Sequence, residues 1–257
     1  ATMQALRLRT TANTQLLNNG GFTITLGSTA ASGQGAGLFL AHTADNAVAH
    51  TANFTFGGGQ EGMIYTSFNG ASSFVRLNGN INGTNGLTLF GDGRLRLGGI
   101  NNFGGPLTIN SGDIRLTSNQ GAGLLTGSPT EINMWGGILS LNGATRHNNN
   151  LTFYNDARLS NDNVGGAGFN NLTVEARSGS NAPVIVWSQN VSGTNINTAY
   201  GGLTLNGPAQ FSIVHTLQIN GAISGSANLE KYMNERIYLG GDSSSYSGSL
   251  TAYAGSF

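Results

Sequence analysis

Asp156 and Asp162 are the closest acidic pair in the middle of the chain, and hydrolysis of a glycosidic bond is the chemistry such a pair could perform. That reaction needs two carboxyl groups ~5–9.5 Å apart, on either side of the bond. The surrounding segment 155–163 is rich in Asn and Asp, which are typical of turns at strand ends. No Asp-Asp or Asp-x-Asp pair occurs anywhere in the sequence. We therefore expect both aspartates to be turn residues, and the sequence predicts no catalytic residue and no enzyme activity.

The histidines, His42, His50, His147 and His215, are the next candidates, as metal ligands. His42 and His50 are eight positions apart with Asp45 between them, but no third ligand follows at a metal-binding spacing. For cofactors, the sequence lacks the Gly-Lys of a phosphate-binding loop, and the glycines at 33–37 do not follow the dinucleotide-binding pattern. Asp92 stands alone, whereas calcium-binding nonapeptides act in tandem. The sequence predicts no metal and no cofactor.

Aromatic side chains could form a stripe that stacks against sugars, and they could equally stack between layers of the fold. Phe103 and Tyr246 occupy the same position of an internal repeat described below, which favours a structural role. Both interpretations stay open at this point. The candidate rings are Phe54, Phe56, Tyr65, Phe68, Phe74, Phe90, Phe103, Tyr246 and Phe257.

Charge is scarce in this chain of 257 residues. Charged residues make up 9% and the net charge is zero, against a usual charged fraction of ~25%. A single lysine, Lys231, and ten dispersed arginines are poor material for binding nucleic acid or for stabilising the enolate of a polysaccharide lyase. The absence of cysteine excludes disulfides and thiolate metal sites. Because all apolar runs are far too short to span a bilayer, we expect no membrane insertion of this segment, and the lack of charge predicts no nucleic-acid partner.

The elements that would position these residues are short β-strands. Brief runs alternate apolar and polar side chains, as in Leu95–Leu97, Leu107–Ile109 and Leu203–Leu205. Asn-Gly, Gly-Gly or Ser-Gly pairs bound them and would supply positive φ at the corners. Helical composition is confined to Ala227–Arg236. Since Asn-Gly also marks β-hairpins, an antiparallel sandwich or barrel is the alternative to a solenoid.

A long-range duplication favours the solenoid. Residues 75–99 and 217–241 align without a gap at an offset of 142, with 9 identities in 25 positions. With one inserted residue the similarity continues to residue 257, so the segments 75–116 and 217–257 are related. Repeats of strand-rich sequence indicate stacked coils, in which each repeat buries its face against the next.

The block from Leu95 to Ile114, which recurs at Ile237–Phe257, resembles the autotransporter-associated β-strand repeat, also called the passenger-associated transport repeat. Its alternating strand is followed by Gly-Gly, an aromatic residue, a Gly-rich pair and Leu-Thr-Ile. The resemblance covers roughly residues 62–160 and 200–257. It implies a right-handed parallel β-helix that is extracellular or exposed on the bacterial cell surface, and it implies no catalytic activity.

We therefore predict one right-handed parallel β-helix spanning residues 1–257, an all-β solenoid of about twelve coils at ~20 residues per coil. The alternation predicts which side chains point inward. They are Val75, Leu77, Ile81, Leu95, Leu97, Leu107, Ile109 and Ile114 in the first repeat, and Leu217, Ile219, Ile223, Ile237 and Leu239 in the second.

For function, the sequence favours a structural building block of an extracellular fibre, sheath or filament. The alternatives are an adhesin that binds glycans or cell surfaces and, third, a polysaccharide lyase or hydrolase. Neither end of the chain looks like a polar cap, so we expect head-to-tail assembly with other copies of the chain. The expected interface residues are Leu6, Leu8, Leu250, Tyr253 and Phe257, and a proline at Leu8 is expected to block elongation.

Overall fold

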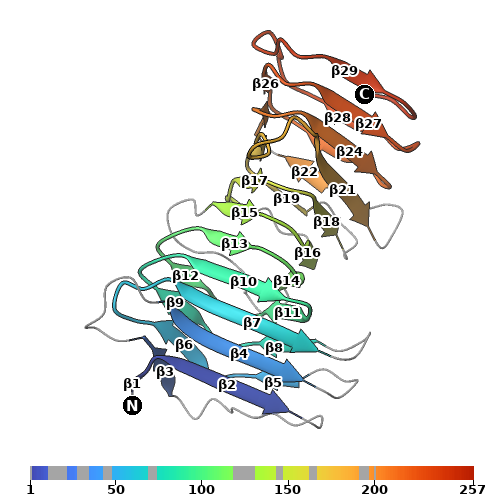
Figure 1. Cartoon of the computed structure of the whole chain (residues 1–257). Helices are drawn as coiled ribbons and strands as arrows, with labels where there is room; N and C mark the ends of the chain where they lie inside the picture. Colours follow the sequence, from blue (N-terminus) through green and yellow to red (C-terminus); the bar gives the residue numbers. More distant parts are fainter. Residues whose placement is uncertain are drawn as a thin grey trace. The chain divides into compact units, whose positions relative to one another are not determined.

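The computed structural model describes residues 2–10, 22–27, 35–42, 48–68, 74–117, 131–142, 147–161, 167–190, 197–199 and 201–257. The chain forms two compact units, unit 1 (residues 1–130) and unit 2 (residues 131–257). Each unit consists of short strands that lie one above another in three sheets (Figure 1). The described residues contain no α-helix.

Unit 1 follows a three-sided path, in which the chain visits sheets II, III and I in turn and then returns to sheet II one layer higher. Sheet I contains β1 (Thr2–Met3), β3 (Thr23–Leu26), β6 (Asn53–Phe56), β9 (Ile81–Gly83) and β12 (Asn102–Phe103). Sheet II contains β2 (Ala5–Thr10), β4 (Ala36–His42), β7 (Gly62–Phe68), β10 (Leu87–Gly91) and β13 (Leu107–Ile109). Sheet III contains β5 (Val48–His50), β8 (Val75–Leu77), β11 (Arg94–Leu97) and β14 (Asp113–Thr117).

Unit 2 repeats this arrangement with sheets IV, V and VI. Sheet IV contains β15 (Ile132–Met134), β17 (Leu151–Phe153), β20 (Leu172–Val174), β23 (Leu203–Leu205) and β26 (Ile223–Gly225). Sheet V contains β16 (Ile138–Asn142), β18 (Ala157–Asn161), β21 (Val184–Asn190), β24 (Ala209–Ile213), β27 (Leu229–Tyr232) and β29 (Leu250–Ala252). Sheet VI contains β19 (Ala167–Phe169), β22 (Asn197–Ala199), β25 (Leu217–Ile219) and β28 (Ile237–Leu239).

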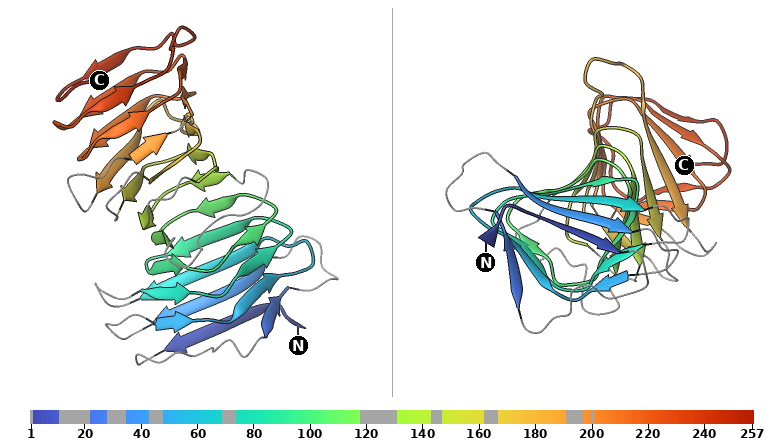
Figure 2. Two further views of the ribbon diagram at one scale, coloured as in Figure 1. Left: turned by 180° about the vertical axis from the view of Figure 1, so that it is seen from behind. Right: turned by 60° about the horizontal axis from the view of Figure 1, so that its bottom comes forward.

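Both units are right-handed parallel β-helices, as predicted (Figures 1 and 2). Strands of one sheet pair in parallel, for example β7 with β10 and β10 with β13. The antiparallel sandwich or barrel is therefore wrong.

The coils are unequal in length. A short one runs from Ile132 to its partner in register, Leu151, and a much longer one runs from Ala5 to its partner Gly37. The prediction of about twelve coils assumed ~20 residues for each. Longer coils lower the number that the chain can form, because each one takes up more of the sequence.

The core runs through the middle of each unit as rows of aliphatic side chains. Leu38, Ile64, Leu89 and Ile109 follow one another in register along sheet II, and all are 0% exposed. Twelve of the thirteen predicted inward residues are buried. The exception, Leu239, is half-buried, because β28 has a partner strand on one side only among the described strands.

The duplicated segments have matching strands. Val75–Leu77 corresponds to Leu217–Ile219, Ile81–Gly83 to Ile223–Gly225, and Leu107–Ile109 to Leu250–Ala252. Within the second segment, the residues with helical composition form β27 and the turn after it. The pairing of β27 with β24 imposes this extended conformation, which shows tertiary context overriding local composition.

Candidate functional site

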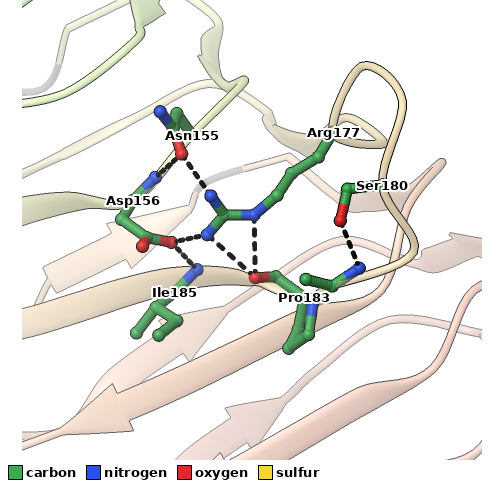
Figure 3. Close-up of polar contacts among 7 residues, drawn as sticks. Asn155, Asp156, Arg177, Ser180, Pro183 and Ile185 are labelled. Atoms are coloured by element: carbon green, nitrogen blue, oxygen red, sulfur yellow. Dashed lines mark hydrogen bonds and ion pairs between the residues drawn. The ribbon is translucent and has the colours of Figure 1, made fainter.

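Asp156 belongs to a structural cluster on unit 2 (Figure 3). Its carboxylate accepts a hydrogen bond from the backbone N–H of Ile185 at 2.7 Å and forms an ion pair with Arg177. The Arg177 guanidinium also donates to the carbonyl oxygen of Pro183, from Nε at 3.1 Å and from Nη2 at 3.0 Å. Arg177 and Asp156 thereby hold the turn after β20 against the start of β21. The other predicted turn residue, Asp162, lies outside the described residues.

The buried histidines His42 and His50 lie at strand ends in unit 1. The His42 Nδ1 is hydrogen-bonded to the Thr10 hydroxyl, and its ring contacts Phe68 edge-on. His50 is 1% exposed, and burial, with a smaller contribution from the charge of His42, lowers its pKa from 6.5 to about 4. Asp45 lies outside the described residues, which contain no group of three His, Cys, Asp or Glu side chains placed to hold a metal.

His147 is a core residue of unit 2 as well as a loop residue. Its ring stacks on Phe169 with centroids 5.5 Å apart, and burial lowers its pKa from 6.5 to about 4. The imidazole Nδ1 of His147 is buried with no hydrogen-bond partner, as is that of His50. His215 is half-buried. Burial makes the side chains of His42, His50 and His147 parts of the folded core.

The candidate aromatic stripe divides into two groups. Phe54, Phe56, Phe68 and Phe103 are buried, whereas Tyr65, Phe74, Phe90, Tyr246 and Phe257 are partly exposed. Since the buried group fills the core, the structural interpretation holds for those four rings.

Tyr65 and Phe90, from the exposed group, form a row with Phe39 on the outer face of sheet II. Phe39, Tyr65 and Phe90 are aligned on β4, β7 and β10, with ring centroids 5.4 and 5.2 Å apart. Arg7 on β2 is the next residue in the row. A groove of about 500 Å³ lies beside it, with Ala41 and Ser67 among its lining residues. Phe39, which sequence reasoning missed, is 45% exposed.

A row of arginines occupies the outer face of sheet III. Arg76, Arg96 and Arg115, on β8, β11 and β14, are partners in register. Each is separated from the next in the sequence by the length of one coil, and so the fold brings dispersed arginines together. The prediction that the arginines are dispersed is therefore wrong for these three, which are far apart in the sequence but adjacent in the folded chain. The signal that could have found them is their spacing, read against the coil length.

Phe74 and the ion pair between Arg94 and Asp113 lie beside these arginines. The guanidinium carbons of Arg76 and Arg96 lie 4.8 and 3.8 Å from the centroid of the Phe74 ring. Beside them Arg94 Nε lies 3.2 Å from Asp113 Oδ2. A cavity of about 140 Å³ is lined by Phe74, Arg94, Leu95, Arg96, Asp113 and Arg115. We call Arg76, Arg96 and Arg115, together with Phe74, the arginine row.

Three of the predicted assembly residues, Leu6, Leu8 and Leu250, lie on strands with an open edge, whereas Tyr253 and Phe257 follow the last strand, β29. β2 pairs only with β4, and β29 only with β27, among the described strands. Leu6 and Leu8 are half-buried, although their partners in register, Leu38 and Leu40, are at most 1% exposed. Leu250 and Tyr253 are 38% and 60% exposed, and Phe257 is half-buried.

The backbone of β2 shows which amides face the open edge. The N–H of Gly37 donates to the carbonyl oxygen of Gln4 at 3.1 Å, so Gln4 faces β4. Alternate residues of a strand face the same side, so the Leu8 amide also faces β4 and the Arg7 amide faces the open edge. A proline at Leu8 would therefore disrupt the β2–β4 pair, and Arg7 is the position at which to test stacking.

The same reasoning applies to β29. The N–H of Leu229 donates to the carbonyl oxygen of Ser249 at 2.9 Å, so Ser249 faces β27. The amides of Leu250 and Ala252 therefore face the open edge.

The chain matches no protein-family model, no curated protein and no solved structure. No described helix is long and apolar enough to cross a membrane.

Proposed function

We propose that the chain is a non-enzymatic structural β-solenoid of an extracellular or bacterial surface assembly, built by stacking of coils. The observation that carries this proposal is the pair of open strand edges, on β2 and β29, each with aliphatic side chains in core positions. A further coil of the same kind would pair with these backbone groups and cover Leu6, Leu8 and Leu250. Another copy of the chain, or more chain in a longer protein, could supply that coil.

The surface location rests on the resemblance to autotransporter passenger repeats. The low charge is consistent with stacking, because little repulsion opposes contact between coils. An interface of one coil edge against another is heterologous, and repetition of such an interface gives a filament and not a closed dimer.

Assembly is tested with the purified chain, by sedimentation and negative-stain electron microscopy over a range of concentrations. We expect filaments whose length increases with concentration, and we expect Arg7→Pro to shorten them by removing an outward-facing donor. Arg7→Ala is the matched control, because it removes the same side chain and keeps the N–H. A chain that remains monomeric at high concentration and neutral pH would overturn the head-to-tail proposal.

Adhesion to glycans is the second candidate, and the row of Phe39, Tyr65 and Phe90 beside its groove is the observation that favours it. A glycan array probed with the native chain and with Tyr65→Ala tests this function. Retention of a neutral glycan that is lost in Tyr65→Ala but kept in Tyr246→Ala would support adhesion through the row. Equal retention of both variants would exclude it.

A further inference from the structure

The arginine row places positive charge in one line along unit 1. Arg76, Arg96 and Arg115 lie on successive strands, and strands of a sheet are ~4.8 Å apart. Arg94 adds a fourth guanidinium beside the row, and its side chain is 51% exposed. The carboxylates near them are Asp113, which is paired with Arg94, and Asp92, two positions before Arg94. The described charged groups of this face therefore carry more positive than negative charge, in a chain whose net charge is zero.

Two of these guanidinium groups, those of Arg76 and Arg96, are held in place before any ligand arrives. The Phe74 ring contacts both Arg76 and Arg96, and such cation–π contacts fix the planes of the groups. Fixed positions reduce the conformational entropy that binding would cost. Each guanidinium has five N–H donors, so a group that already has one partner keeps donors for another.

A further observation points to a ligand. The cavity beside the row, of about 140 Å³, has three arginines among its lining residues and is large enough for one carboxylate or sulfate group. Arginine is the side chain best suited to bind such planar or tetrahedral anions through paired hydrogen bonds.

We propose that the arginine row binds an acidic polysaccharide, with the carboxylate or sulfate groups of the sugar chain lying along successive coils. The linear repeat of the guanidinium groups fits a linear polyanion, in which charges also recur along one direction. The small number of arginines fits a sugar chain more closely than duplex DNA, which carries a charge every ~1.7 Å and is bound by broad basic surfaces. The proposal does not depend on filament formation.

The test measures retention of the native chain on immobilised heparin, on immobilised polygalacturonate and on neutral dextran, with elution by a salt gradient. We expect retention on at least one acidic matrix and none on dextran. Heparin carries sulfate and carboxylate groups, whereas polygalacturonate carries carboxylates alone, so the comparison identifies the anion. Duplex DNA is the competitor, and preferential binding of DNA over both polysaccharides would overturn the proposal.

Arg96→Gln is the central variant, because Arg96 occupies the middle of the row. We expect about a tenfold loss of affinity for the retained polysaccharide, since a charged hydrogen-bonding partner is lost. The triple variant Arg76→Gln, Arg96→Gln, Arg115→Gln should elute at the salt concentration of a non-binding protein. If it does not fold, as judged by circular dichroism, the single variants Arg96→Gln and Arg115→Gln decide the question.

Arg236→Gln is the matched control, because it removes one positive charge from an exposed position in unit 2. Affinity that falls equally in Arg236→Gln and Arg96→Gln would show a general charge effect and overturn the proposal. Native protein that is not retained on either acidic matrix at low salt would also overturn it.

Discussion

His50 and His147 each place an imidazole in the core, at 1% and 6% exposure. Burial lowers both pKa values to about 4, while the unfolded chain has histidine pKa values near 6.5. As pH falls below 6.5 the unfolded state therefore binds protons that the folded state does not, and stability falls until pH about 4. We expect each histidine to contribute a loss of up to about 3 kcal/mol over this window.

This pH dependence is measured as the free energy of urea unfolding between pH 7.5 and 4. His147→Gln should flatten the curve, and the same change at the half-buried His215 is the control. A curve that is flat from pH 6.5 to 4 in the native chain would contradict the prediction.

Lys231, the chain's one lysine, is 0% exposed and occupies a core position on β27. Its ammonium group donates to the carbonyl oxygens of Met233 at 2.7 Å and Ala254 at 2.6 Å. Burial lowers its pKa, and the charge of Glu235 partly opposes that shift. The side chain thus satisfies one carbonyl group in the turn after β27 and one in the turn after β29.

Truncation of this side chain is expected to be costly. Lys231→Ala removes both hydrogen bonds and leaves a cavity, so the free energy of unfolding should fall by about 2–4 kcal/mol. Lys231→Met keeps most of the packing and should cost about half as much. Denaturant unfolding measures both, and a Met variant as unstable as the Ala variant would mean that packing contributes little.

At the scale of the strands and turns, the repeated glycines are needed for close contact between coils. A Cβ at Gly99 would lie 2.1 Å from the carbonyl oxygen of Gly79, and one at Gly241 would lie 2.2 Å from the carbonyl carbon of Gly221. Neither Gly99 nor Gly241 has positive φ. The expectation of positive φ is correct at other glycines, such as Gly91 and Gly225, with φ of 120° and 100°.

Gly99→Ala should therefore destabilise the chain by about 2 kcal/mol or more, because backbone atoms of the neighbouring coil must move. Gly37→Ala is the matched control. A Cβ there would lie 3.5 Å from the nearest atom, an ordinary contact. Thermal unfolding of the two variants tests the difference. Equal melting temperatures would contradict the prediction, because they would show that the neighbouring coil makes room for the methyl group without loss of stability.

Asparagines at the turns act through their side chains. The backbone N–H of Ile100 donates to Asn80 Oδ1 at 3.0 Å, and that of Ile81 donates to Asn101 Oδ1 at 3.2 Å. Met233 is the one described non-glycine residue with positive φ. The turn composition thus correctly marks corners, but the reason for asparagine is hydrogen bonding between coils.

Alternation of apolar and polar residues was enough to predict the faces of the strands, because burial of one face fixes the register. It could not predict the coil lengths, since turns such as the one closed by Arg177 depend on contacts between neighbouring coils. The arginine row could not be predicted for the same reason, because its members can be recognised as neighbours only when the coil lengths are known. The burial of the histidines was not predicted, because polar residues at strand ends resemble turn residues in sequence.

At the scale of the whole molecule, stability rests on burial and backbone pairing. With 9% charged residues, ion pairs such as Arg94–Asp113 and Arg177–Asp156 are few and partly exposed. Exposed pairs contribute ~0–1 kcal/mol each and are screened by salt. We expect the free energy of unfolding to change by less than about 1 kcal/mol between low and about 1 M sodium chloride. A loss several times larger would contradict this.

The unequal coils give each unit a mechanical signature. Backbone hydrogen bonds in a parallel β-helix run along the stacking direction, so tension applied along that direction peels coils away one at a time. A released coil lengthens the chain by up to ~3.3–3.6 Å for each of its residues. The coil from Leu172 to its partner Leu203 is about half as long again as the coil from Leu203 to its partner Ile223. In a force–extension trace the longer coil would give the proportionally larger step, and the order of such steps would record the order in which the coils detach.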